Sequence, residues 1–267
     1  MKRIGRVLFA ALVILLLTVF LYSAWNIYSI WHEYKKAERH YDSLSETVVA
    51  ASVPRPSASP AVVAPPEKEE APAPRWSEFS PVSVDFDELT ALCADMVGWL
   101  YLPDTVINYP VVQGTDNDYY LNRFYDGKPN VGGTLFVDYV CPGDFSGANT
   151  IIYGHNMKNG SMFAVLNRYA EQSFYDEHPV LYLNTPAQNY KVEFFTGFVS
   201  DPEGMIYTAA FPSDTAYGEF LDEIRSRSCF VSPVTVTTGD RILTLSTCST
   251  SGVDMRFVLV GKLTEIG

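Results

Sequence analysis

The clearest alternation of hydrophobic and polar positions lies near the carboxyl end, in Arg241–Cys248. Even-numbered positions from 242 to 248 share one face and odd-numbered positions the other, which is the period of a half-buried strand. The apolar run at 255–261 predicts a second strand after a connection that contains Gly252. The pattern predicts an antiparallel hairpin in which Cys248 ends one strand and Arg256 begins the next, where a scaffold can present reactive groups to solvent.

Short runs of apolar and β-branched residues, separated by turn residues, continue this pattern upstream. Many short strands without repeated βαβ units predict a mostly-β fold, an antiparallel barrel with peripheral helices. Amphipathic or capped stretches predict helices over 85–96, 116–122, 161–168 and 213–225. The predicted strands lie at 98–103, 106–113, 133–139, 150–153, 180–183, 190–199 and 234–238, followed by the closing hairpin.

The amino-terminal region has a different pattern. Residues 7–25 are apolar apart from Thr18 and Ser23, and at about 1.5 Å per residue they span roughly 28 Å, close to a bilayer's hydrocarbon thickness. A cleaved signal peptide is the alternative, but its apolar core is shorter and needs a small-x-small cleavage site. We expect an uncleaved transmembrane anchor, with residues 1–6 in the cytoplasm because they carry three basic residues.

Residues 26–49 carry mixed charges and predict a juxtamembrane helix on which His40 is solvated. The stretch 50–75 contains seven of the 17 prolines and predicts an extended linker that holds a folded domain, 76–267, away from the membrane. The net charge is −12, and from residue 76 onward 24 acidic residues oppose 10 basic ones. This balance argues against a nucleic-acid partner, because phosphate binding needs a basic surface.

Three residues at strand ends could together perform acyl transfer. A cysteine thiol becomes a nucleophile when an imidazole takes its proton, so Cys248 needs a partner such as His155, which follows the strand predicted at 150–153. The oxyanion of the resulting intermediate needs donors, and Arg256 and the backbone N–H of Ser249 are candidates. The sequence around Cys248 and His155 offers no further ligands at zinc-like spacing, so we expect no metal.

The other three cysteines have apolar or aromatic neighbours and are expected to be buried thiols. A Cys93–Cys141 bridge is conceivable outside the cell, but four cysteines allow three pairings and the sequence does not choose among them. Asp254 lies two residues before Arg256 and either orients the guanidinium or is a turn residue.

These motifs together resemble the sortases, membrane-anchored cysteine transpeptidases of Gram-positive bacteria. The resemblance is carried by residues 244–248, by Arg256 eight positions after Cys248, and by residues 153–155. Residues 116–121, residues 133–138 and the long segment between 199 and 234 are similar to class B sortases in particular. The resemblance covers 85–261 and implies a closed sortase-type barrel of about eight strands.

The resemblance also implies the reaction. Cys248 would attack the carbonyl after the threonine of a C-terminal Asn/Ser-Pro-x-Thr-Gly/Asn sorting motif on a secreted protein, forming a thioester. An amine of a lipid-linked peptidoglycan precursor would then resolve the thioester, with His155 as general acid and base and Arg256 at the oxyanion. Carried over residue by residue, the substrate-binding positions are Asn117, Leu121, Ser246, Tyr207 and Ser249.

Alternatives remain at this stage. The same three residues would serve a cysteine peptidase that uses water, a pilin-polymerising sortase would use a lysine acceptor, and a non-catalytic surface domain would leave Cys248 unreactive. The expectation is a single-pass membrane protein with an extracellular catalytic domain that needs no cofactor.

Overall fold

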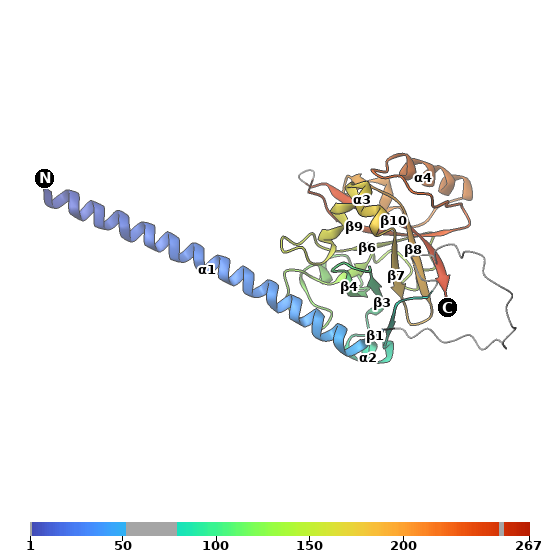
Figure 1. Cartoon of the computed structure of the whole chain (residues 1–267), viewed down its shortest axis with the longest axis horizontal. Coiled ribbons are helices and arrows are strands. Elements are labelled where there is room, and N and C mark those ends of the chain that lie inside the picture. Colours follow the sequence, from blue (N-terminus) through green and yellow to red (C-terminus); the bar gives the residue numbers. More distant parts are fainter. Residues whose placement is uncertain (1, 52–78, 251–253) are drawn as a thin grey trace, which may run out of the picture.

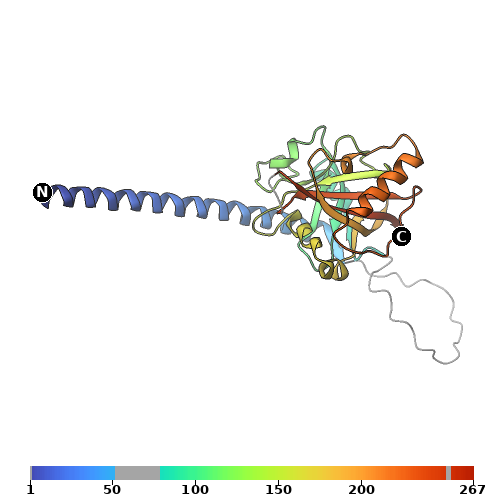
Figure 2. The same cartoon turned by 90° about the horizontal axis from the view of Figure 1, so that it is seen from above.

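The computed structural model describes residues 2–51, 79–250 and 254–267. One long helix, α1 (Lys2–Val48), projects from a rounded barrel body (Figures 1 and 2). The remaining elements are, in chain order, β1 (Val49–Ala51), β2 (Val82–Val84), α2 (Phe86–Leu92), β3 (Met96–Tyr101), β4 (Asn108–Val112), the 3₁₀ helix η1 (Tyr119–Asn122), β5 (Leu135–Val137), β6 (Asn149–Tyr153), η2 (Phe163–Ala170), α3 (Gln172–Glu177), β7 (Val180–Asn184), β8 (Asn189–Ser200), η3 (Met205–Tyr207), α4 (Asp214–Ser226), β9 (Arg241–Cys248) and β10 (Arg256–Ile266).

Eight strands close into a barrel in the order β10-β8-β7-β3-β4-β5-β6-β9, which confirms the predicted mostly-β barrel of about eight strands. The barrel is not antiparallel throughout, because β4 pairs with β5 and β6 pairs with β9 in parallel. Parallel neighbours need a crossover connection. The segment that contains η1 connects β4 to β5, and residues 154–240 connect β6 to β9. Because β6 and β9 are parallel neighbours, the residues that follow Tyr153 and those at Cys248 lie at the same end of the barrel.

Strand β9 is buried on both faces, so the expected half-buried strand is wrong. Leu243 and Leu245 belong to the barrel core, as alternation predicts. The opposite face carries Ile242, which is buried in a second cluster that includes residues of α4. Helix α4 therefore covers the outer face of β9 and β10 and leaves only the strand end at Cys248 exposed.

The predicted helix starts are confirmed where a cap fixes them. Asp85 accepts a hydrogen bond from the Glu88 backbone N–H at 3.0 Å at the start of α2, and Ser213 does the same for Ala216 in α4 at 3.2 Å. Helix α2 ends at Leu92, earlier than predicted. The strand predicted at 234–238 is wrong. These residues have no strand partner, and Val234 and Val236 pack against the second cluster, the one that contains Ile242 and residues of α4.

The carboxyl end of α1 is part of the folded body. Tyr41, Leu44 and Val48 recur on one helix face and are buried in the barrel's core cluster. Strand β1 follows directly and pairs with β2, so that Ala51 lies opposite Val82. The folded unit therefore begins before residue 76. The proline-rich linker lies almost entirely outside the described residues. The described strands on either side of it, β1 and β2, pair with each other, so α1 stays joined to the barrel.

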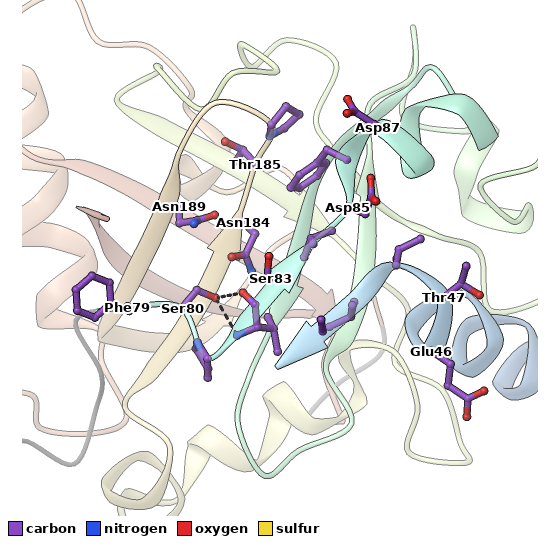
Figure 3. Close-up of a pocket in the computed structure, with 18 of the residues that line it drawn as sticks. Glu46, Thr47, Phe79, Ser80, Ser83, Asp85, Asp87, Asn184, Thr185 and Asn189 are labelled. Atoms are coloured by element: carbon purple, nitrogen blue, oxygen red, sulfur yellow. Dashed lines mark hydrogen bonds between the residues drawn. The ribbon is translucent and has the colours of Figure 1, made fainter. Parts of the chain in front are cut away.

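A cleft opens between β1, β2 and the turn that joins β7 to β8 (Figure 3). Asn189 at its edge pairs with Ile266 at the far end of β10, whereas Arg256 begins that strand. Ten steps along β10 at about 3.3 Å each place this cleft roughly 30 Å from Arg256. It is lined by none of the candidate catalytic residues, so their chemistry lies at the other end of the barrel.

Candidate active site

Cys248 and Arg256 are brought together by the β9–β10 register. They lie directly opposite each other in the antiparallel pair, as the predicted hairpin requires. Directly opposed residues project from the same face with Cβ atoms about 4.5–5.5 Å apart. The thiol is exposed and the guanidinium half-buried, at a strand end that solvent can reach.

His155 joins them through the parallel β6–β9 pair. Tyr153 lies opposite Ser246, and the ladder continues as the Gly154 N–H donates to the Ser246 carbonyl at 3.1 Å. With a side-chain period of two, His155 falls beside Cys248 on the same face of the sheet. The fold therefore places the predicted cysteine, histidine and arginine on three adjacent strand ends.

The ring of His155 is held by a main-chain oxygen. Its Nε2 lies 2.7 Å from the carbonyl oxygen of Leu121, the residue that the sequence predicted for the substrate groove. A carbonyl can only accept, so Nε2 carries the proton and Nδ1 is the nitrogen left to exchange a proton with a thiol. No acidic side chain is needed for this orientation.

Two asparagines that the sequence analysis did not select hold the backbone of Cys248. The Cys248 carbonyl accepts from Asn156 Nδ2 at 2.9 Å and from Asn167 Nδ2 at 3.3 Å. Asn167 Oδ1 also accepts from the Thr250 N–H at 3.1 Å, which fixes the orientation of this amide. These residues are candidate positioning groups for the nucleophile. Only the place of Asn156 next to His155 could have pointed to one of them.

Tyr207 and Ser246 lie together beside the thiol. Their hydroxyl oxygens are 2.9 Å apart. Burial raises the pKa of Tyr207, while Ser246 and the charge of Arg256 act to lower it. Fully buried Asn149 donates to the carbonyls on both sides of Tyr207, those of residues 206 and 208, each at 3.0 Å. The candidate groove residue Tyr207 is thus fixed to β6, the strand that carries His155.

Two other candidates have structural partners. The Ser249 N–H donates to the Met255 carbonyl at 2.9 Å, so in this conformation it does not point to a substrate oxyanion. Asn117 Oδ1 accepts from the Tyr139 N–H at 3.1 Å and connects the η1 loop to the β5–β6 loop. Asp254 is a turn residue with φ of 62°, and its carbonyl, not its carboxylate, accepts from Arg256 Nη1 at 3.1 Å.

The remaining thiols lie away from this site. All four cysteines are free, so the structure contains no Cys93–Cys141 bridge. Burial raises the pKa of Cys141. Cys229 is exposed, contrary to expectation, because it follows the end of α4 on the surface. Within the described residues no group of three His, Cys, Asp or Glu could hold a metal ion.

Comparisons with known proteins agree with this geometry. Residues 100–264 match the sortase domain family. Sortase B of Listeria monocytogenes is 41% identical over 178 residues, which are 66% of this chain and 72% of that protein. A solved Staphylococcus aureus sortase B–substrate complex has a TM-score of 0.65 at 35% identity, covering 68% of this chain and 85% of the other. A structure of sortase B complexed with triglycine has a TM-score of 0.65 at 34% identity, with 68% and 86% covered.

The matched region spans more than half of the chain and contains most of the barrel and all three strand ends. The chain therefore belongs to the sortase family and is a cysteine transpeptidase. Within this family it is a class B sortase, as the identity to sortase B sequences and structures indicates.

Proposed function

We propose that this sortase cleaves a C-terminal Asn/Ser-Pro-x-Thr-Gly/Asn motif of secreted proteins after threonine and joins them to an amine of the cell wall. The observation that carries this proposal is the register, which sets Arg256 opposite Cys248 and His155 two residues beyond the partner of Ser246. A relative of known structure is a sortase B–substrate complex, which supports a peptide substrate for this chain.

The first half-reaction forms a thioester. The sulfur of Cys248 attacks the threonine carbonyl carbon, and the negative charge that develops on its oxygen is stabilised by the guanidinium of Arg256. Nδ1 of His155 takes the proton of the Cys248 thiol as the sulfur attacks. The C–N bond then breaks, and the leaving amine takes this proton from Nδ1. The carbonyl of Leu121 keeps Nε2 occupied, so the proton moves at Nδ1.

The second half-reaction transfers the acyl group. An acceptor amine loses a proton to His155 and attacks the thioester, a new amide forms and Cys248 leaves as thiolate. We propose an amine of a lipid-linked peptidoglycan precursor as the acceptor. A solved sortase B complexed with triglycine supports a glycine-type amine, and a diaminopimelate-type amine is the other acceptor to test.

The substrate groove in this proposal lies at the Cys248 end of β9, beyond the part of the strand that α4 covers. Ser246 and Tyr207 form its floor next to the thiol, and their mutual hydrogen bond fixes both hydroxyls. Asn117 and Leu121 contribute the side that carries η1, while Ser249 borders the site on the connection between β9 and β10.

We further propose that α1 spans the cell membrane once, with its amino end in the cytoplasm. The helix is long and apolar enough to cross a membrane, and Leu15, Leu16 and Phe20 are 59%, 60% and 66% exposed where Figure 1 shows it standing free of the body. The stretch from Trp25 to Tyr41 would hold the barrel about 24 Å outside the anchor. The docked helix takes the spacer role expected of the linker.

The test uses the full chain in detergent micelles. Peptides with Asn-Pro and Ser-Pro motifs are incubated without an acceptor, with triglycine, with a diaminopimelate-containing acceptor or with a lysine-containing peptide, and products are identified by mass spectrometry. We expect cleavage after threonine and an amine adduct, both lost in Cys248→Ala. Cleavage without any adduct would indicate a peptidase, a lysine adduct alone would indicate a pilin-polymerising enzyme, and no cleavage of any peptide would contradict the proposal.

A further inference from the structure

The backbone around Leu121, whose carbonyl contacts His155, is held by further hydrogen bonds. On one side of Leu121, the Tyr120 carbonyl accepts from the Thr134 N–H at 3.0 Å. On the other side, the Arg123 carbonyl accepts from Thr134 Oγ1 at 2.9 Å. Thr134 therefore holds the backbone on both sides of the one carbonyl that turns to His155.

The residue before Thr134 also sets the position of this backbone. Gly133 has φ of +57°, and a Cβ at this position would lie 2.5 Å from the carbonyl oxygens of both Tyr120 and Leu121. Only glycine allows so close an approach. The 130–134 turn thus packs directly against the peptide groups that present the Leu121 oxygen, with no side chain between them.

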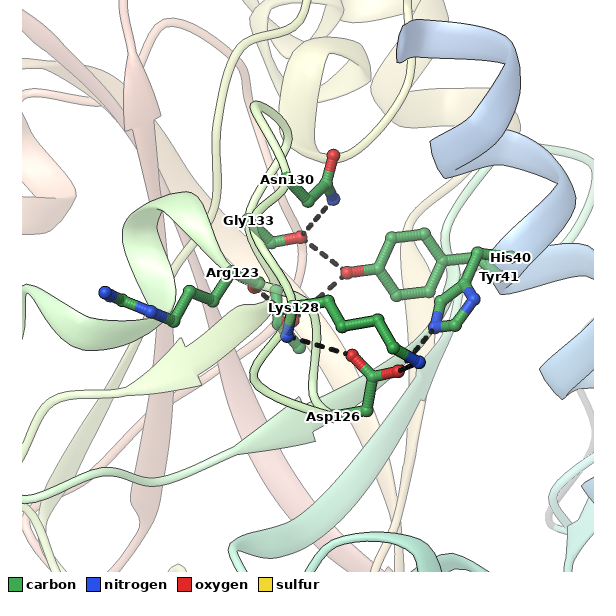
Figure 4. A network of polar contacts seen from close by, with 8 residues as sticks. His40, Tyr41, Arg123, Asp126, Lys128, Asn130 and Gly133 are labelled. Carbon is green, nitrogen blue, oxygen red and sulfur yellow. Dashed lines mark hydrogen bonds and ion pairs between the residues drawn. The ribbon is translucent and has the colours of Figure 1, made fainter.

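Helix α1 binds this same turn. The Tyr41 hydroxyl donates to the Gly133 carbonyl at 2.5 Å and lies 3.1 Å from Thr134 Oγ1 (Figure 4). The Tyr41 side chain is only 4% exposed, and burial raises its pKa, so the hydroxyl keeps its proton. Asn130 Nδ2 donates to the same Gly133 carbonyl at 3.3 Å.

The ring of Tyr41 is held as firmly as its hydroxyl. It makes edge-to-face contacts with Tyr109 of β4 and with Phe124, which follows the η1 loop, at centroid distances of 5.3 and 5.5 Å. The contact is therefore a packed interface that continues the core, not a single surface hydrogen bond.

We infer that α1 is a working part of the active site, and that Tyr41 positions the catalytic histidine. Tyr41 fixes Gly133 and Thr134, these fix the backbone on both sides of Leu121, and the Leu121 carbonyl orients the His155 ring. Tyr41 never meets substrate, so it is a positioning residue. The inference rests on the proposed function, in which His155 transfers the proton.

The decisive comparison is between two hydroxyl deletions on the same helix face. Tyr41→Phe removes the hydroxyl that reaches the turn and leaves the ring packed. Ser45→Ala is the matched control, because Ser45 Oγ accepts from Asn108 Nδ2 at 2.7 Å and so joins α1 to β4 without contact with the turn. Both variants are made in the full chain in detergent micelles. Active sites are counted as the thiol-reagent labelling that is lost when Cys248→Ala is added to each variant, because Cys229 is also exposed, and the melting temperature is recorded.

Tyr41→Phe is expected to lower kcat per titrated site about three- to tenfold with KM unchanged, as the loss of one orienting hydrogen bond implies. Ser45→Ala is expected to keep kcat within about twofold, although it removes a hydrogen bond of the same kind. A purely structural role for Tyr41 would lower the melting temperature of both variants alike and leave kcat per site unchanged, and that result would overturn the inference.

A second variant tests the same chain of contacts, from Tyr41 through Gly133 and Thr134 to Leu121 and His155, which we call the relay. Thr134→Val keeps its backbone N–H on Tyr120 but loses the hydroxyl that meets Tyr41 and Arg123. If the residues act as one unit, the double variant with Tyr41→Phe loses no more activity than the worse single variant. Fully additive losses would separate Tyr41 from the turn and contradict the relay.

The ring of His155 can also be observed without substrate. In a chain labelled with ¹⁵N-histidine, the His155 Nε2 resonance is assigned with His155→Gln, and we expect it to move in Tyr41→Phe and Thr134→Val but not in Ser45→Ala. An unmoved resonance would refute the relay even if transpeptidation is normal. Conversely, a moved resonance in a chain that cuts no peptide would support the relay while the proposed function fails.

Discussion

At the scale of single residues, Cys248 combines an exposed thiol with a backbone carbonyl that accepts two side-chain hydrogen bonds. A strand end next to a loop is prone to fray, and the exposed thiol has no packing to hold it. Asn167 reaches from η2 to both sides of this end, with its NH₂ group on the Cys248 carbonyl and its oxygen on the Thr250 N–H. The nucleophile is thus fixed by polar contacts rather than by burial.

We predict that Asn167→Ala lowers kcat/KM about tenfold, because two backbone hydrogen bonds at the strand end are lost together. Asn159→Ala is the matched control, since the Asn159 oxygen serves only the neighbouring Ser161 among the hydrogen bonds of the described residues. The check is steady-state peptide cleavage. Equal activity of the two variants would show that Asn167 does not position the nucleophile.

At the scale of elements, the interface between α1 and the barrel contains a titratable ring. His40 stacks on Tyr125 and lies 4.2 Å from Phe124 between ring centroids, and Asp126 is 3.9 Å away (Figure 4). Burial lowers the pKa of His40 below 6.5, and the nearby lysines Lys36 and Lys128 act in the same direction against the carboxylate. The expected solvated histidine is therefore part of the interface.

This pKa shift predicts a pH dependence of stability. Below pH 6.5 His40 binds a proton more readily in the unfolded chain than in the folded protein. Its contribution to the free energy of unfolding is therefore fully present above pH 6.5 and is lost as the pH falls. Asp126 contributes nothing in this window, because its lowered pKa affects stability only below 3.8. We expect the melting temperature to fall by about 2 °C more in the wild type than in His40→Phe between about pH 7.5 and 5.5. Parallel curves for the two proteins would contradict this.

The elements also show which features the sequence could predict. Alternation around Cys248 and the residues near His155 and Arg256 predicted three catalytic positions at strand ends, because local patterns determine where strands stop. The parallel β6–β9 pair, the burial of Ile242 under α4 and the strand missing at 234–238 depend on contacts distant in sequence. Tyr41, Asn149 and Asn167 carry no local signal at all, since their partners are 92, 57 and 81 positions away.

At the scale of the whole molecule, α1 and the barrel form one folded unit. Tyr41, Leu44 and Val48 enter the core cluster, and β1 then pairs with β2. The strands on either side of the proline-rich stretch pair with each other, so a piece that starts at residue 76 lacks the α1 side chains that contribute to the core cluster.

We predict that residues 76–267 alone melt about 10 °C below the full chain, because the helix side chains no longer cover apolar surface of the barrel. A chain that starts at residue 26 keeps the docked helix without the apolar segment and is expected to melt like the full protein. If the pieces that start at 26 and 76 melt at the same temperature, the helix is not part of the folded unit.

The most direct test of the acyl-transfer site is intact mass spectrometry of the full chain shortly after it is mixed with a sorting peptide. We predict a mass increase equal to the acyl fragment that ends at the peptide's threonine. This fragment is located on Cys248, is released by added amine and is much reduced in His155→Ala and Arg256→Ala. An unmodified Cys248 under conditions where the peptide is cut, or acylation that persists without His155 and Arg256, would contradict the claim that these three strand ends form one site.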